Sequence, residues 1–352
     1  ILNNPLLEIS ELPQFDKITP SIIKPAIENI LQENRQKISN LETIDDLKWE
    51  NFIQPLELLD DRLNKAWSPV RHLNSVNSSD ELREAYNECL PLLSEYSSEI
   101  SQNRALFNSY QRLVNAESFK LLQPAQQKTL QDALLYFRLG GVDLSEPDKK
   151  KYQSIQKKLS ELTTSYENNL LDATQSWQLH LEDESRLAGL PAYAVAMLKQ
   201  YAEQKSLTGY IITLDMPCYI AVITYADDRE LRKTLYQAFS TRASDQGFTD
   251  IKWNNAENMV KILQYRQQKA QLLGFEHYAE YSLQTKMASS CTEVIEFLNE
   301  LAEKSRSFAL KDLAQLQAFA QAEGFSDELM VWDMAYFSEK LKQQKYDISD
   351  EV

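Results

Sequence analysis

The histidines of this sequence are few and widely separated, which limits the metal chemistry that the chain can support. They are His72, His180 and His277. A zinc site on a helix uses the pattern H-E-x-x-H, because this spacing places two imidazoles on one helix face and leaves the glutamate as a base. The pattern does not occur here. We therefore predict that the chain carries no metal-binding and no catalytic residue, and its substrate-binding residues stay open.

Each histidine has a simpler structural interpretation. His277 and Glu280, in FEHYAEY, have a spacing that suits half of a metal site, but a solvated pair on a helix surface fits it better. His180 falls on the polar face of a predicted strand, where we expect a hydrogen-bonded surface residue. His72 follows SPVR in a predicted turn, and we expect its role to be structural.

The other reactive side chains also lack the spacing that catalysis requires. The cysteines are far apart and form no C-x-x-C pair, which indicates free thiols in a reducing compartment. A cysteine nucleophile needs a histidine base nearby, and the sequence cannot place one beside the other. The G-x-S-x-G and glycine-rich phosphate patterns are absent. Adjacent acids are typical of helix caps or solvated faces, although carboxylate catalysis stays open. The residues concerned are Cys89, Cys218 and Cys291, and the pairs Asp45 and Asp46, Asp60 and Asp61, and Asp227 and Asp228.

The composition predicts a mainly helical protein and argues against two classes of partner. Among 352 residues there are only 7 glycines, well below the usual share of about 7%, which leaves little room for hairpins and flexible linkers. A net charge of -15 argues against nucleic acid and against an anionic membrane as partners. No run of about 18 apolar residues and no signal peptide occurs, so we expect a cytoplasmic protein.

The chain is predicted to be organised around residues 209–288. A strand at about 209–215 is expected to end at Pro217, which has no N–H to donate to a sheet. Asp227 and Glu230 have the spacing of a capping box at the start of the helix that follows. A change from a period of two to a helical period marks the boundary between these elements.

A second helix in this segment carries the cations that could meet a substrate. It is predicted to begin after Asn254 or Asn255 and to end at Gly274. Arg266 and Lys269 on this helix could face substrate carboxylates, but solvated or ion-paired positions fit better. The helix also has a stripe that neighbouring elements are expected to cover. The stripe consists of Met259, Ile262, Leu263, Arg266, Ala270 and Leu273.

One small β element is predicted within the helical body. Trp177, Leu179 and Leu181 alternate with polar residues, which predicts a strand at about 175–182 with one buried face. Its natural partner is the strand at 209–215, in either orientation, with a helix at 191–204 between them. Further helices are predicted from caps, prolines and apolar spacing at 20–31, 49–63 with a kink or break at Pro55, 79–100, 124–139, 147–169, 290–324 and 332–345.

Several long ungapped segments, spread over essentially the whole chain, carry a specific resemblance to a known family. They are NPLL, LPQFDKITPSIIKPAI, SPVRHLNSVNSSDELREAYNECLPLLSEYSS, TLDMPCYIAVITYADDRELRKTLYQAFSTRASDQG, RQQKAQLLGFEHYAEYSLQTKMA and WDMAYFSEKLKQQKYDISDE. In this order they resemble the first half of the thimet oligopeptidase family of zinc metallopeptidases.

The resemblance implies a mostly helical, two-lobed clamshell with a deep channel in which short peptides are cleaved internally. In that family two histidines of H-E-x-x-H and a downstream glutamate hold the zinc, and the metal-bound water attacks the peptide. The chain resembles only the part before that motif, so no catalytic or zinc-binding residue can be carried over to it. The parent enzyme would use zinc, and this chain is expected to bind none and to be inactive alone.

The resemblance also suggests how the chain is divided and what it contacts. We expect an N-terminal helical region at 1–170, a small β element with a helical insert at 171–215, and the helical start of a catalytic region, truncated before the zinc motif, at 216–352. The expected partners are short peptides, which would lie along a channel wall, and the missing C-terminal catalytic half. The surface that this half would cover is expected to be apolar, so its exposure should promote self-association of the chain alone. The alternative is a non-enzymatic helical scaffold or peptide-binding module.

Overall fold

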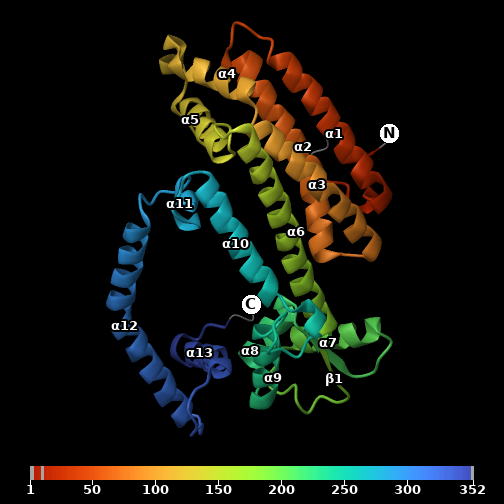
Figure 1. Cartoon of the computed structure of the whole chain (residues 1–352). Coiled ribbons are helices and arrows are strands. Elements are labelled where there is room, and N and C mark those ends of the chain that lie inside the picture. Colours follow the sequence, from red (N-terminus) through yellow and green to blue (C-terminus); the bar gives the residue numbers. More distant parts are fainter. Residues whose placement is uncertain (1–3, 9–11, 350–352) are drawn as a thin grey trace. The chain divides into compact units, whose positions relative to one another are not determined.

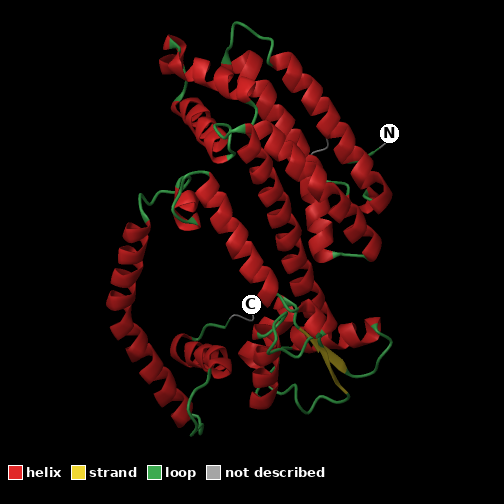
Figure 2. Ribbon diagram, viewed as in Figure 1, coloured by secondary structure: helices red, strands yellow, loops and turns green. Residues whose placement is uncertain are grey.

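The computed structural model of the chain describes residues 4–8 and 12–349. The described part is mainly helical and contains one two-stranded sheet, as the sequence predicts (Figure 2). Two compact units are present. The first unit comprises Ile1–Leu162 and Ile262–Ser282, and the second comprises Thr163–Lys261 and Leu283–Val352. Within the described ranges no helix has the length and apolarity that a bilayer crossing requires.

The first unit is built around three long helices that lie side by side (Figure 1). The central one, α1, begins at Pro20 directly after Thr19, because proline fits the first helical turn. Ile23, Ile27 and Ile30 recur every three or four residues and are fully buried against the neighbouring helices. The helices of this unit are α1 Pro20–Leu41, α2 Gln54–Val76, α3 Asp80–Ser101, α4 Arg104–Asn115, α5 Pro124–Leu139, the start of α6 Glu146–Ser176, the end of α10 Ala256–Leu272, and α11 Tyr278–Leu283.

Helix boundaries in this unit follow the capping residues and prolines. The break predicted at Pro55 is confirmed, since a π-helical turn, Trp49–Ile53, gives way to α2 there. The Ser79 side chain accepts a hydrogen bond from the Leu82 N–H and caps α3. His72 was expected in a turn, and this prediction is wrong: the residue lies inside α2, which continues through Pro69.

The second unit contains the sheet. Strands β1 Gln178–Leu181 and β2 Tyr210–Thr213 pair antiparallel, with Leu179 opposite Ile212. The first strand is shorter than predicted, because residues 174–176 complete the last turn of α6. Ile211 and Ile212, on opposite faces of β2, are both fully buried. The remaining helices of this unit are α7 Ala192–Gln204, α8 Met216–Tyr225, α9 Arg229–Ser240, α12 Cys291–Ala322 and α13 Val331–Tyr346.

Two predictions about helix starts in this unit are wrong. Pro217 does not end the strand, since β2 stops at Thr213. It occupies the first turn of α8, where its missing N–H would be unpaired anyway, and Asp215 caps that helix. The cap of α9 is Asp228, whose carboxylate accepts from the Leu231 N–H, and not Asp227. Proline and adjacent acids are ambiguous signals when they stand alone.

The apolar stripes of α10 and α12 are only partly covered. Gly274 ends α10 with φ +87° and Gly324 follows α12 with φ +88°, as their positions predict. The expectation that neighbours cover the whole α10 stripe is wrong, because the Met259 and Leu263 side chains are 52% and 63% exposed. Only the C-terminal part of the α12 stripe is buried, against α13.

Candidate functional site

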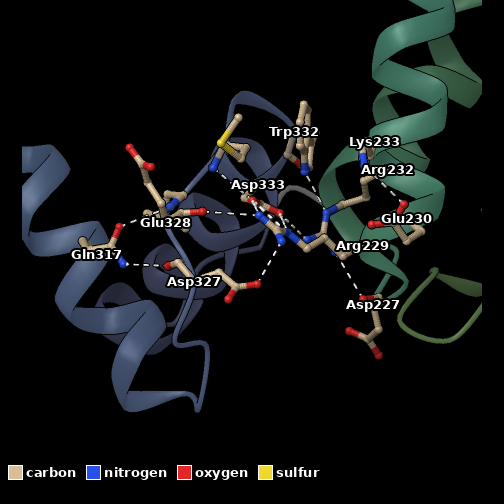
Figure 3. Close-up of polar contacts among 12 residues, drawn as sticks. Asp227, Arg229, Glu230, Arg232, Lys233, Gln317, Asp327, Glu328, Trp332 and Asp333 are labelled. Atoms are coloured by element: carbon tan, nitrogen blue, oxygen red, sulfur yellow. Dashed lines mark hydrogen bonds and ion pairs between the residues drawn. The ribbon is translucent and has the colours of Figure 1, made fainter.

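A buried ion-pair cluster joins α9 to α13 in the second unit (Figure 3). The Asp333 carboxylate accepts hydrogen bonds from Nη2 of Arg229 at 2.9 Å and from Nη2 of Arg232 at 2.8 Å. It also accepts from the Met330 N–H at 3.0 Å. The Arg232 and Asp333 side chains are 2% and 0% exposed, so water contributes little to their solvation.

The electrostatics of the cluster keep Asp333 ionised. Burial disfavours its charged form, but hydrogen bonds from Arg229, the Met330 N–H and Arg232 outweigh this, so the pKa of Asp333 lies below its ordinary value. The Arg232 guanidinium also donates to the Ala226 carbonyl at 2.7 Å and lies 4.0 Å from the centre of the Tyr336 ring. These partners suit a structural cross-link between two helices better than a catalytic group.

Beside this cluster, a polar cavity of about 460 Å³ is lined by Asp227, Tyr336 and Lys340 among others. The Tyr336 hydroxyl donates to Asp227 Oδ1 at 2.7 Å, and Lys340 Nζ lies 3.4 Å from the same oxygen. These three side chains therefore already have protein partners. Asp227, predicted as a helix cap, instead connects the start of α9 to α13.

A second cluster, in the first unit, combines two cations with tyrosine rings. Gly274 ends α10, and the chain folds back so that α11 lies beside the last turns of α10. The Arg266 guanidinium lies 5.2 Å from the centre of the Tyr278 ring, and Lys269 Nζ lies 4.7 Å from that of Tyr281. Each pair repeats with a spacing of three, so the two cations and the two rings face each other in register.

A third ring, from α6, completes the surroundings of Lys269. The Tyr152 ring centre lies 5.5 Å from Lys269 Nζ, and the buried Tyr152 hydroxyl donates to the Leu139 carbonyl at 3.2 Å. Burial, and secondly the charge of Arg266, lower the pKa of Lys269 to about 8. This differs from the solvated or ion-paired position that the sequence suggested, because Lys269 is half-buried and the described residues give it no carboxylate partner.

Each of the three histidines has its own contacts. His180 Nε2 donates to the Thr208 carbonyl at 2.6 Å, which gives it the hydrogen-bonded surface position that was predicted. His72 contacts the Phe15 ring. His277 caps α11: its Nδ1 accepts from the Glu280 N–H at 3.3 Å, while the Glu280 carboxylate accepts from the Glu276 N–H. In residues 4–8 and 12–349, no three His, Cys, Asp or Glu side chains are grouped to hold a metal ion.

The cysteines and the remaining acid pairs do not form a reactive site in the described structure. Burial raises the pKa of Cys89 to about 12 and that of Cys218 to about 11, so both thiols stay protonated near neutral pH. Cys291 lies at the start of α12 as a free thiol. The acids Asp46, Asp60 and Asp61 bond to neighbouring residues in sequence.

Sequence reasoning did not identify Asp333 and Arg232. Their contact joins residues separated by 101 positions, and no local pattern predicts such a pair. One feature of the sequence could have indicated that Arg232 is buried: it lies between Leu231 and Leu235 on the apolar face of α9. A charged residue at such a position needs a buried partner.

Comparisons with known proteins agree with the sequence resemblance. The family described as "Neurolysin/Thimet oligopeptidase, N-terminal domain" matches residues 27–150, and the one described as "Peptidase family M3" matches residues 222–352. Oligopeptidase A of Escherichia coli is 47% identical over 351 residues, and that of Haemophilus influenzae is 46% identical over 350. A dipeptidyl carboxypeptidase of E. coli is 27% identical over 363 residues.

These relatives are much longer than the chain. Each alignment covers 99% of the chain but only 51% to 52% of the relative. The chain therefore spans about half the length of the proteins that it matches, and the matched half includes both the ion-pair cluster and the tyrosine–cation cluster.

Proposed function

We propose that this chain supplies the N-terminal part of a zinc-dependent oligopeptidase of peptidase family M3 that cleaves short peptides internally. The observation that carries the proposal is the continuous similarity to oligopeptidase A, at 47% identity over 99% of the chain. The helices of the chain would form a wall of the substrate channel. A location in the cytoplasm belongs to the same proposal.

The described residues do not fit a catalytic zinc site. His72, His180 and His277 lie in α2, in β1 and before α11, and each has a local structural contact. A catalytic zinc needs three convergent protein ligands and an open position for water. The zinc ligands and the base would therefore come from the C-terminal half of the enzyme, and the chain alone would hydrolyse nothing.

The exposed apolar face of α12 supports a partner of this kind. The Phe297 and Phe308 side chains are 62% and 66% exposed, although helix faces with such residues are normally buried against another element. Packing of the C-terminal half against this face would remove it from water. The same face explains why the chain alone is expected to self-associate.

Reconstitution tests the proposal directly. The chain would be purified alone and also co-expressed with the C-terminal half of E. coli oligopeptidase A, the part outside its similarity to this chain. Zinc content and cleavage of a short quenched peptide should be at background for the chain alone and should rise with the co-expressed half. Zinc-dependent cleavage by the chain alone would overturn the proposal that the chain is inactive without the other half. Absence of association with the other half would favour a separate scaffold or peptide-binding module.

A further inference from the structure

We propose that Arg266 and Lys269 form a binding site for the C-terminal carboxylate of a peptide. The choice of a peptide as the ligand rests on the proposed function. The location of the site rests on geometry alone: two cations on one face of α10, with the rings of Tyr278 and Tyr281 opposite them and the Tyr152 ring beside Lys269.

The charge balance of this cluster is incomplete. Arg229 and Arg232 share the Asp333 carboxylate, whereas within the described part of the chain neither Arg266 nor Lys269 has an ion pair or a side-chain hydrogen bond. Two like charges three residues apart on a helix repel each other, and burial of one of them adds a desolvation penalty. An anion between them would offset both effects. Acids are plentiful in a chain with 52 Asp and Glu residues and a net charge of -15, yet among the described residues none pairs with these two cations.

The surroundings favour a carboxylate on a peptide over a polyanion. The rings of Tyr278, Tyr281 and Phe275 pack together, with ring centres 5.5 Å apart for Tyr278 and Tyr281 and 5.7 Å apart for Phe275 and Tyr281. They offer apolar surface to the residue next to the carboxylate, which a free inorganic anion would not use. The overall negative charge also disfavours ligands of high charge.

The site has a pH signature. With a pKa of about 8, Lys269 is mainly protonated at pH 7 and loses its charge as the pH rises above 8. Arg266, as a guanidinium, stays charged over this range. A bound carboxylate favours the charged form of Lys269, so binding should raise the pKa of Lys269 and should weaken above pH 8.

The test uses the full 352-residue chain with ¹³C-dimethylated lysines, followed by NMR. Two peptides of the same short apolar sequence would be titrated, one with a free C-terminal carboxylate and one with a C-terminal amide. We expect the carboxylate peptide to bind about tenfold more tightly and to raise the pKa of Lys269, since one charge-assisted contact is worth this much. Lys269→Met should abolish the preference for the carboxylate peptide. Lys269→Arg should keep this preference, and the preference should no longer weaken above pH 8.

Lys261→Met removes an exposed lysine of the same helix that pairs with Glu257, and it should leave the preference intact. Equal binding of the two peptides would overturn the carboxylate site but leave peptide binding standing. Absence of binding by both would contradict the site and also count against a peptide-contacting role for the chain. A larger response of Lys269 to inorganic phosphate than to the carboxylate peptide would also overturn the proposal.

Discussion

At the residue scale, the carboxylate of Asp333 is shielded from solvent and accepts hydrogen bonds from Arg229 and Arg232. Asp333→Asn leaves the buried Arg232 guanidinium without its counter-charge, so we expect the free energy of unfolding to fall by about 3 kcal/mol. Urea denaturation followed by circular dichroism measures this change in the free energy of unfolding. Asp327→Asn is the matched control, because Asp327 contacts Arg229 from the surface, and its effect should stay within about 0.5 kcal/mol. Equal effects of the two substitutions would contradict the buried cross-link.

The same carboxylate predicts a pH dependence. Hydrogen bonds from the arginines hold the pKa of Asp333 below its ordinary value of 3.8, so the unfolded chain takes up this proton at a higher pH than the folded one. The contribution of the Asp333 carboxylate to the free energy of unfolding is therefore complete at pH values above its ordinary pKa. It is lost as the pH falls through the lower pKa of the folded state. The stability difference between the wild type and Asp333→Asn should be constant from pH 7 to pH 5 and should shrink below pH 4. A constant difference down to pH 2 would exclude this origin.

Residues that act locally were the ones that the sequence predicted best. The cap at Ser79 depends on neighbours in the chain, and it is confirmed. Asp333 depends on α9, which is about a hundred positions away, and Lys269 on rings from α6 and α11. Such environments are set by how elements pack, which no local pattern encodes.

At the element scale, the turn at Gly274 sets α11 against α10. Its φ of +87° favours glycine, and no atom within 4 Å would meet an added Cβ, so the effect of a substitution is purely conformational. Gly274→Ala should cost about 1–2 kcal/mol, and Gly274→Asn less. As α11 loosens, water should reach Lys269 and its pKa should move from about 8 toward its ordinary 10.5. NMR titration of labelled lysines reports this shift.

Gly324 is the matched control for this prediction. It has φ +88°, also lacks atoms within 4 Å of an added Cβ, and follows α12 in the second unit. Gly324→Ala should therefore show a similar conformational cost without changing the pKa of Lys269. An equal pKa shift in both variants would mean that Lys269 responds to overall destabilisation and not to the position of α11.

The elements themselves were largely predictable, and the exceptions have a common reason. Helix caps at Ser79 and Ser290 and the stop at Gly274 are strong local signals. The start of α8 was missed because Pro217 ends a strand and begins a helix equally well. The orientation of the two strands could not be predicted, since the helix between them permits either.

At the scale of the whole molecule, composition and apolar spacing indicated a mainly helical chain, and the structure agrees. Periodicity also implied that neighbouring elements would cover the stripe of α10. It identifies a face that needs a partner but does not say which polypeptide supplies it. The exposed residues of α12 therefore carry information about association that the helix assignment alone does not.

Self-association follows from that exposed face. Phe308 on α12 is 66% exposed, and contiguous apolar surface of this kind drives association in water. We expect light scattering to show the mass rising with concentration, and Phe308→Glu to reduce this because a carboxylate resists burial without a partner. Gln315→Glu adds the same charge at an exposed polar position of α12 and should leave the mass unchanged. A monomer at every concentration, or equal effects of both variants, would show that this face does not drive association and would weaken its assignment as the contact for a catalytic half.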